Sequence, residues 1–410
     1  MDCKAVRLDF PELERGVTYL DSAASSLKPR SVIEAIMVFM EHSYANVHRG
    51  VYSLSMEASR AYEEAHDVVA KFINAKSWDE VVFVKNTTEA LQLLALTLAF
   101  NNVIGRGDEV IVTEADHHSS ILPWVRVARI VGAKVRLLPV DSNGVPRWEL
   151  LEGMVSEKTK VVAFSHASNV TGYVSDARRV ARIAHSVGAL VALDGAQSVP
   201  HMKIDVRELE ADFLAFSGHK MLGPTGIGVL WGRRDLLENL EPPLGGGGTV
   251  KRVGLGGDEI AIEWDDLPWR FEAGTPPIVE AVGLTEAVRY LEELGMEDIE
   301  SHERKLTSYT LRRLEELGDK IRILGPRDAR VKLGIVAFNV GNVDPSMVGL
   351  WLDQQGIAVR TGLHCAHMLH DKLGASNGSV RASFYIYNCL EDVDKLVDSI
   401  GELLKTITKL

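Results

Sequence analysis

Residues 217–228 read Ser217-Gly218-His219-Lys220-Met221-Leu222-Gly223-Pro224-Thr225-Gly226-Ile227-Gly228. The mostly apolar run before them, Asp212 to Phe216, predicts a buried strand, and the glycines and the proline after Lys220 predict a turn. Lys220 is therefore expected just past a strand end, where open α/β sheets place their ligands. A lysine desolvated there can lose its proton and form a Schiff base with a carbonyl group. A single loop lysine is more often an ordinary solvated side chain. The neighbouring residues therefore decide whether Lys220 has a functional role.

From residue 80 onward, apolar β-rich runs alternate with helix-like segments. This alternation predicts right-handed strand–helix–strand crossovers and a mostly parallel seven-stranded sheet that is covered on both faces. Its ligand site is expected at the carboxyl ends of the strands. The expected strands are Val81 to Val84, Glu109 to Thr113, Lys134 to Val140, Lys160 to His166, Ala189 to Asp194, Asp212 to Phe216 and Gly226 to Trp231.

The chain of 410 residues is longer than one hydrophobic core supports, which predicts at least two domains. A glycine-rich break, Gly245 to Gly248 and again Gly254 to Gly257, precedes an expected long helix at about Ile278 to Leu294. The remainder reads as a smaller α+β unit. We therefore expect an N-terminal segment, 1–20, that packs with the small domain, a large domain, 21–280, and a small C-terminal domain, 281–410.

Charge and composition limit the possible functions. The net charge of -12, without a basic tract, argues against binding to nucleic acid. No apolar run could span a bilayer and no signal peptide is evident, so we expect a cytoplasmic protein without a membrane partner. The three cysteines, Cys3, Cys365 and Cys389, are far apart. This odd, sparse set argues against a disulfide framework, a four-cysteine zinc site or a protein-held iron–sulfur cluster.

Pyridoxal phosphate is a cofactor that forms a Schiff base with lysine and withdraws electrons from a substrate carbon. Its phosphate needs donors, best supplied by a helix N-terminus. Thr87 and Thr88 follow the first expected strand and open a helix, although either could serve only as a helix cap. Ser217 and His219, beside the lysine, are further candidate donors.

The cofactor ring makes two more demands on the protein. A carboxylate must keep the ring nitrogen protonated. Asp194 ends an expected strand on the ligand side, although an aspartate after a strand is often only a turn former. Gln197, three residues later, is placed to reach the phenolic oxygen. His117, which follows another strand, could cover the ring. The tripeptide Asp116-His117-His118 also resembles a metal-binding motif of phosphoesterases, but no matching upstream aspartate cluster is present, and we expect no metal.

These residues belong to a set of motifs that resembles the class V aminotransferase family, and within it the cysteine desulfurases of the SufS type, which include selenocysteine lyases. The resemblance runs in order from about Tyr19 to Lys405, nearly the whole chain. The motifs are Asn46-Val47-His48-Arg49-Gly50, Asn86-Thr87-Thr88-Glu89, His117-His118, Asp194-Gly195-Ala196-Gln197, Ser217-Gly218-His219-Lys220 with Gly223-Pro224-Thr225-Gly226, Phe271-Glu272-Ala273-Gly274-Thr275-Pro276 and Arg360-Thr361-Gly362-Leu363-His364-Cys365.

The resemblance implies fold type I of the pyridoxal-phosphate enzymes, with the cofactor held in the large domain and the cysteine loop in the small one. It implies that Lys220 holds the cofactor, Asp194 pairs with the pyridinium and His117 stacks on the ring. It further assigns the phosphate to Thr87, Thr88, Ser217, His219 and, from the second subunit of a homodimer, Thr275. Asn169, Arg381, Arg360, His48 and Arg49 are implied around the substrate, and a guanidinium suits a carboxylate. By themselves His48 and Arg49 read as plain loop residues.

Cys365 determines which reaction is expected. A thiolate is the nucleophile, and His364 and Arg360 are close enough in sequence to supply positive charge. The alternatives are a buried inert cysteine, or a metal site with His364, His367 and His370, whose spacing on one short loop suits a metal poorly. The chain also departs from the family at Leu363, where a histidine is usual, at His367 and His370, where the family is commonly apolar, and at Thr249, where an acid is usual.

We therefore expect an enzyme that converts L-cysteine to L-alanine and keeps the sulfur as a persulfide on Cys365. A sulfur-acceptor or iron–sulfur scaffold protein is the expected partner. The close alternative is a selenocysteine lyase, with L-selenocysteine as substrate. Another lyase or aminotransferase of this family, such as a kynureninase or an epimerase, would leave Cys365 incidental, and a non-catalytic relative would not need Lys220 and Asp194.

Overall fold

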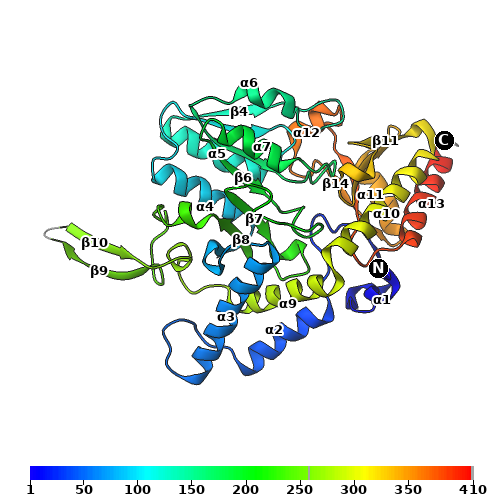
Figure 1. Cartoon of the computed structure of the whole chain (residues 1–410). Coiled ribbons are helices and arrows are strands. Elements are labelled where there is room, and N and C mark those ends of the chain that lie inside the picture. Colours follow the sequence, from blue (N-terminus) through cyan, green and yellow to red (C-terminus); the bar gives the residue numbers. More distant parts are fainter. Residues whose placement is uncertain (257–258, 408–410) are drawn as a thin grey trace.

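The computed structural model describes residues 1–256 and 259–407 (Figure 1). Its central sheet has seven strands in the order β2-β8-β7-β6-β5-β3-β4. Strand β8 runs antiparallel to β2 and β7, and the other neighbouring strands pair in parallel. The predicted mostly parallel α/β sheet is therefore confirmed. The strands are β2 (Val81–Val84), β3 (Glu109–Thr113), β4 (Lys134–Leu138), β5 (Thr159–Ser165), β6 (Leu190–Asp194), β7 (Phe213–Ser217) and β8 (Gly228–Gly232).

Helices cover both faces of this sheet, because its central strands carry buried apolar residues on both faces. In β7, Leu214 and Phe216 belong to the core shared with one set of helices, whereas Phe213 and Ala215 belong to the other core. Successive side chains of a strand point to opposite faces, so a continuous apolar run needs cover on both sides. The first set is α2 (Arg30–His42), α3 (Ser53–Phe72), α7 (Ala177–His185) and α9 (Ile278–Leu294); the second is α4 (Thr87–Phe100) and α5 (His118–Val131).

Two helices begin at the carboxyl edge of the sheet. Asn86 caps α4 by accepting a hydrogen bond from the backbone N–H of Glu89 at 3.0 Å, and the Glu89 carboxylate accepts one from the N–H of Lys85. His117 caps α5, because its Nδ1 accepts a hydrogen bond from the N–H of Ser119 at 3.1 Å. These caps direct two helix N-termini toward the strand ends that carry the predicted cofactor residues.

The C-terminal part contains an antiparallel sheet in the order β11-β12-β15-β14. Helix α9 packs against α2 and α3, so it lies with the large sheet, and the boundary expected near residue 280 stays a prediction. Among the described residues, no helix is long and apolar enough to cross a membrane. The elements are α10 (Met296–Glu315), β11 (Ile321–Leu324), β12 (Ile335–Val340), α11 (Pro345–Gln354), β13 (Ile357–Ala358), β14 (Arg360–Gly362), α12 (His367–Lys372), β15 (Ser379–Ser383) and α13 (Leu390–Ile407).

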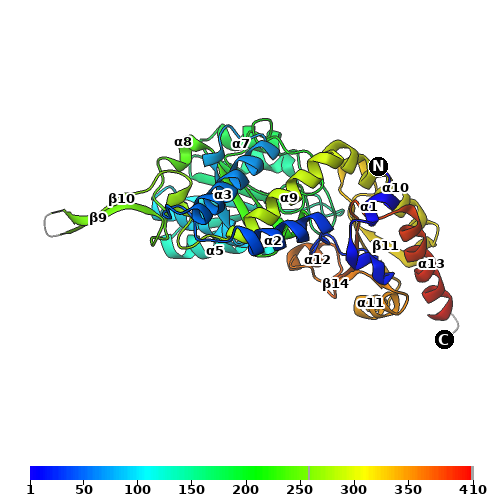
Figure 2. The ribbon, with the colours of Figure 1, turned by 90° about the horizontal axis from the view of Figure 1, so that it is seen from below.

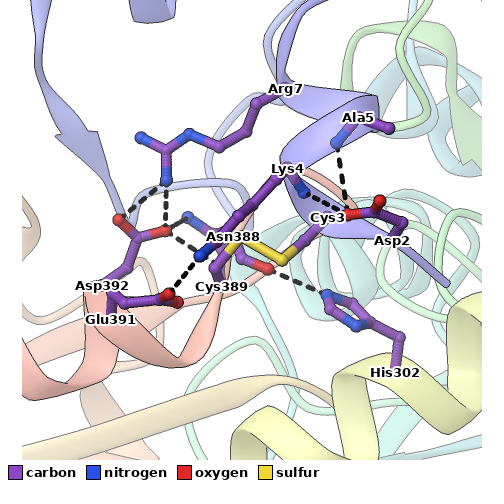
Figure 3. Close-up of a disulfide and its surroundings, with 10 residues drawn as sticks. All are labelled: Asp2, Cys3, Lys4, Ala5, Arg7, His302, Asn388, Cys389, Glu391 and Asp392. Atoms are coloured by element: carbon purple, nitrogen blue, oxygen red, sulfur yellow. Dashed lines mark hydrogen bonds and ion pairs between the residues drawn. A yellow bond between two sulfur atoms is a disulfide. The ribbon is translucent and has the colours of Figure 1, made fainter.

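The two ends of the chain are joined by a disulfide between Cys3, in α1 (Cys3–Arg7), and Cys389, just before α13 (Figure 3). Ion pairs of Lys4 with Glu391 and of Arg7 with Asp392, at 2.7 and 2.8 Å, surround it. We argued against a disulfide framework, and this single bond was not predicted. The bond is difficult to predict from the sequence because the two cysteines are 386 residues apart. In the folded chain their Cα atoms are 5.7 Å apart.

The glycine-rich segment contains a two-stranded antiparallel ribbon that we did not predict. Strands β9 (Val250–Gly256) and β10 (Glu259–Trp264) project from the body of the molecule (Figures 1 and 2). We expected a glycine-rich break there, and Gly257, its last member, lies outside the described residues. The pairing places four exposed apolar side chains on one face of the ribbon, namely Val253, Leu255, Ile260 and Ile262.

Candidate active site

A cavity of about 370 Å³ lies at the carboxyl edge of the large sheet. It collects all the predicted site residues except Thr275, His48 and Arg49. Segments from both sheets and from the N-terminal part of the chain line it. The predicted residues on its wall are Thr87, Thr88, His117, Asn169, Asp194, Gln197, Ser217, His219, Lys220, Arg360, Cys365 and Arg381.

Lys220 ends a short 3-10 turn directly after β7 and faces this cavity. Removal from water lowers the pKa of its ammonium group to about 8, and the negative charge of Asp194 opposes part of this effect. A lysine with this pKa has a substantial fraction of free amine near neutral pH, whereas an ordinary lysine has almost none. Lys220 can therefore act as a nucleophile toward a carbonyl group.

Asp194 is buried at the end of β6, on the same wall. One carboxylate oxygen accepts a hydrogen bond from the N–H of Ala196 at 2.9 Å, and the other accepts one from the Ser120 hydroxyl at 2.5 Å. These two donors fix the orientation of the carboxylate. Ser120 was missed by the sequence reasoning because its partner lies 74 residues away.

His117 supplies an aromatic ring to the cavity. Because its Nδ1 accepts the hydrogen bond from Ser119, the proton of the neutral imidazole lies on Nε2. Burial lowers the pKa of His117 to about 4. The ring is therefore neutral at pH 7, which suits stacking on a cationic pyridinium better than a charged imidazolium does.

Hydroxyl groups gather where α4 begins. The Ser217 hydroxyl accepts a hydrogen bond from the N–H of Thr87 at 2.8 Å and lies 2.6 Å from the Thr87 hydroxyl. The Thr88 hydroxyl lies 2.7 Å from that of Ser119. Burial lowers the pKa of His219 to about 4, so it is a neutral imidazole beside them. Backbone N–H groups and hydroxyls at a helix N-terminus are the usual donors to a phosphate.

Two arginines also line the cavity, and Asp21 connects them. Arg381 is buried and donates to the Asn169 carbonyl at 2.9 Å and to Asp21 at 3.3 Å. Arg360 lies 2.9 Å from the Asp21 carboxylate. Asp21 was not predicted as a site residue, although it lies two residues after the two-residue strand β1 (Thr18–Tyr19), which was a weak sequence signal.

Buried atoms without partners show that this cavity fits the predicted cofactor and an amino-acid substrate. In the described part of the chain, Arg381 Nε and Gln197 Oε1 have no hydrogen-bond partner. An unpaired buried polar atom is costly, so each is suited to receive a ligand group. Together with the amine of Lys220, the carboxylate of Asp194 and the ring of His117, the donor set matches pyridoxal phosphate.

Cys365 lies on a loop between β14 and α12, with an exposed, free thiol facing the cavity. His364 does not supply the positive charge that we expected beside it. Burial lowers the pKa of His364 to about 2, and its Nε2 lies 3.1 Å from the Ser379 hydroxyl, so the ring is neutral. The cations near the thiol are instead Arg360 and Arg381. Among the described residues, no group of three or more histidine, cysteine or acidic side chains could hold a metal ion.

The three remaining predicted residues share a different cavity of about 600 Å³, which also contains Trp269. The His48 ring packs on Trp269 with 4.5 Å between ring centroids. Within one subunit, Thr275, His48 and Arg49 are thus brought together but away from Lys220. Their assignments to the cofactor phosphate and the substrate stay predictions.

The fold and the site define a pyridoxal-phosphate enzyme of the α/β type. A family model described as Aminotransferase class-V matches residues 18–396, and the chain therefore belongs to this family. It is 60% identical to a probable cysteine desulfurase of Aeropyrum pernix over 98% of both chains. It is 45% identical to a cysteine desulfurase of Haloferax volcanii, covering 98% of this chain and 96% of the relative.

A solved structure of a cysteine desulfurase is also similar to this chain. The apo structure of a cysteine desulfurase from Thermococcus onnurineus NA1 matches with a TM-score of 0.93 and 42% identity over 98% of both chains. The family membership confirms the predicted fold and the predicted cofactor, pyridoxal phosphate. The relatives confirm the predicted class of enzyme, a cysteine desulfurase, for which L-cysteine is the implied substrate.

Proposed function

We propose that this enzyme takes the sulfur of L-cysteine onto Cys365 and releases L-alanine. The observation that carries the proposal is the position of the free Cys365 thiol, which shares one cavity wall with Lys220 and Arg381. A nucleophile, an amine that can accept a proton and a cation for a carboxylate are the groups that this reaction needs.

The chain's own residues have distinct roles in this reaction. Arg381 and Asn169 bind the substrate carboxylate. Lys220, Asp194 and His117 would hold pyridoxal phosphate, which would supply an electron sink for the substrate Cα. The Lys220 amine accepts the Cα proton, because its lowered pKa allows it to be free of its own proton. The Cys365 thiolate then forms an S–S bond with the substrate sulfur as the C–S bond breaks. The electron pair stays on the carbon, which takes up a proton and leaves as alanine.

A homodimer is part of this proposal. Thr275 borders a cavity that is open to solvent in one subunit, which suits a residue that acts on a second subunit. The ribbon β9–β10 projects from the body of the molecule (Figure 2). It exposes apolar side chains on one face, as an association surface does. The persulfide sulfur then passes to an acceptor or iron–sulfur scaffold protein in the cytoplasm.

Product analysis of the holoenzyme with L-cysteine tests this function. Wild type should release alanine and, with a thiol reductant, an equal amount of sulfide. Cys365→Ser should keep the absorbance of the bound cofactor but lose sulfide release by at least about a hundredfold, because a hydroxyl is a far weaker nucleophile than a thiolate. Full activity in Cys365→Ser would contradict the proposal. Retained selenide release from L-selenocysteine in that variant would indicate a selenocysteine lyase.

A further inference from the structure

The loop that carries Cys365 adopts an unfavourable backbone conformation. His364 and Cys365 are consecutive non-glycine residues with positive φ angles of 47° and 56°. Non-glycine residues rarely adopt this left-handed conformation, because the Cβ atom comes too close to the following carbonyl oxygen. The surrounding structure must therefore hold the loop in place.

The large domain provides two hydrogen bonds to the backbone of this loop. The Asn169 side-chain amide donates to the carbonyl of His364 at 2.8 Å, and the backbone N–H of His118 donates to the carbonyl of Cys365 at 2.9 Å. Both donors come from the edge of the large sheet, whereas the loop follows β14 of the small sheet. The position of the thiol thus depends on contacts between the two sheets.

The side chain of His118 adds a third contact. Its Nε2 lies 2.8 Å from Nδ1 of His367, and the two rings are parallel within 9° with centroids 4.6 Å apart. His367 begins α12, two residues after Cys365. Burial and the neighbouring His367 lower the pKa of His118, which keeps it neutral at pH 7. The contact between the two rings needs a donor nitrogen on one and an acceptor nitrogen on the other, and an imidazole such as that of His118 can serve in either role.

We propose that His118 and His367 form a clamp that positions the Cys365 thiol for its attack on the substrate sulfur. They are positioning residues, since the hydrogen bond between them holds the short segment that contains Cys365 against α5. The proposal rests on the function proposed above, in which Cys365 receives the sulfur. It uses a histidine, His367, at a position that no other part of that mechanism employs.

The test compares His367→Leu, which removes the hydrogen bond, with His367→Asn, whose side-chain amide can replace Nδ1. His42→Leu, at an exposed histidine on α2, is the matched control. In the holoenzyme, His367→Leu should speed up hydrogen–deuterium exchange of residues 363–367 and lower kcat about tenfold, because a small displacement of a reacting group is enough for such a loss. KM for L-cysteine should stay within about twofold, since Arg381 is untouched. His367→Asn should recover most of kcat.

Unchanged exchange and unchanged kcat in His367→Leu would overturn the clamp. So would an equal loss of kcat in the asparagine variant, which would indicate that the imidazole has another role. Exchange is measured without turnover, so this result is independent of whether Cys365 accepts sulfur. If Cys365→Ser keeps full activity while His367→Leu loosens the loop, the proposed function fails, and the two histidines hold the loop without a role in sulfur transfer. A double variant with His118→Leu should be no slower than either single variant, because both remove the same contact.

Discussion

Asp21 accepts a hydrogen bond from Arg381 at 3.3 Å and thereby holds a buried guanidinium at the edge of the active-site cavity. Arg381 Nη1 is bound to the Asn169 carbonyl, and its Nε is left without a partner among the described residues. The two Nη atoms of the guanidinium are therefore held by protein acceptors, and Nε is free to bind a ligand. This arrangement suits the carboxylate of an amino-acid substrate, because a fixed fork loses little entropy when it binds.

The first prediction concerns this guanidinium. Arg381→Lys should raise KM for L-cysteine by about 10–100-fold with a smaller effect on kcat, since an ammonium keeps the charge but loses the paired geometry. Steady-state kinetics measure it. Arg304→Lys, at a surface arginine that pairs with Glu300, is the control and should change neither constant. An unchanged KM in Arg381→Lys would show that the substrate carboxylate binds elsewhere.

The second prediction follows from the lowered pKa of Lys220, which is about 8 because the amine is removed from water. Only the free amine attacks the cofactor aldehyde. The rate of cofactor attachment to the apoprotein should therefore rise about tenfold per pH unit below pH 8 and level off above about pH 9. Stopped-flow absorbance measures this rate. A rate that still rises at pH 10, as for an ordinary lysine, would contradict the environment described for Lys220.

The third prediction concerns the disulfide between Cys3 and Cys389. Its closed loop includes nearly the whole chain, so Cys3→Ser should lower the free energy of unfolding by about 2–5 kcal/mol. Denaturant unfolding without reductant measures it. Because neither Cys3 nor Cys389 lines the cavity, KM for L-cysteine should not change.

A reductant provides the control for this measurement. It should destabilise wild type to the level of Cys3→Ser and leave the variant unaffected. Equal stability of oxidised wild type and Cys3→Ser would show that the bond is absent in solution or contributes nothing to folding.

The seven strands and the residues at their carboxyl ends were predictable because their signals are local. Apolar runs such as Leu190–Asp194 followed by small residues indicate a buried strand and its end. Parallel strands then bring Asp194 and Lys220 to one edge without any knowledge of long-range contacts. The family motifs add the cysteine loop, which the strand pattern alone does not place there.

The features that the sequence did not predict depend on contacts between distant residues. Asp21 meets Arg360 and Arg381 across 339 and 360 residues, and His118 meets His367 across 249. The ribbon β9–β10 was obscured by its glycines, which usually indicate loops, while Val253 and Ile262 carry its alternating pattern. In each case the tertiary structure supplies information that local spacing lacks.

The central claim is that Cys365 receives the sulfur of L-cysteine. Mass spectrometry of the holoenzyme, mixed with L-cysteine in the absence of reductant and then alkylated, tests it most directly. The peptide that contains Cys365 should carry one additional sulfur atom, and the same peptide from Lys220→Ala should carry none. An unmodified Cys365 in enzyme that has released alanine would contradict the account.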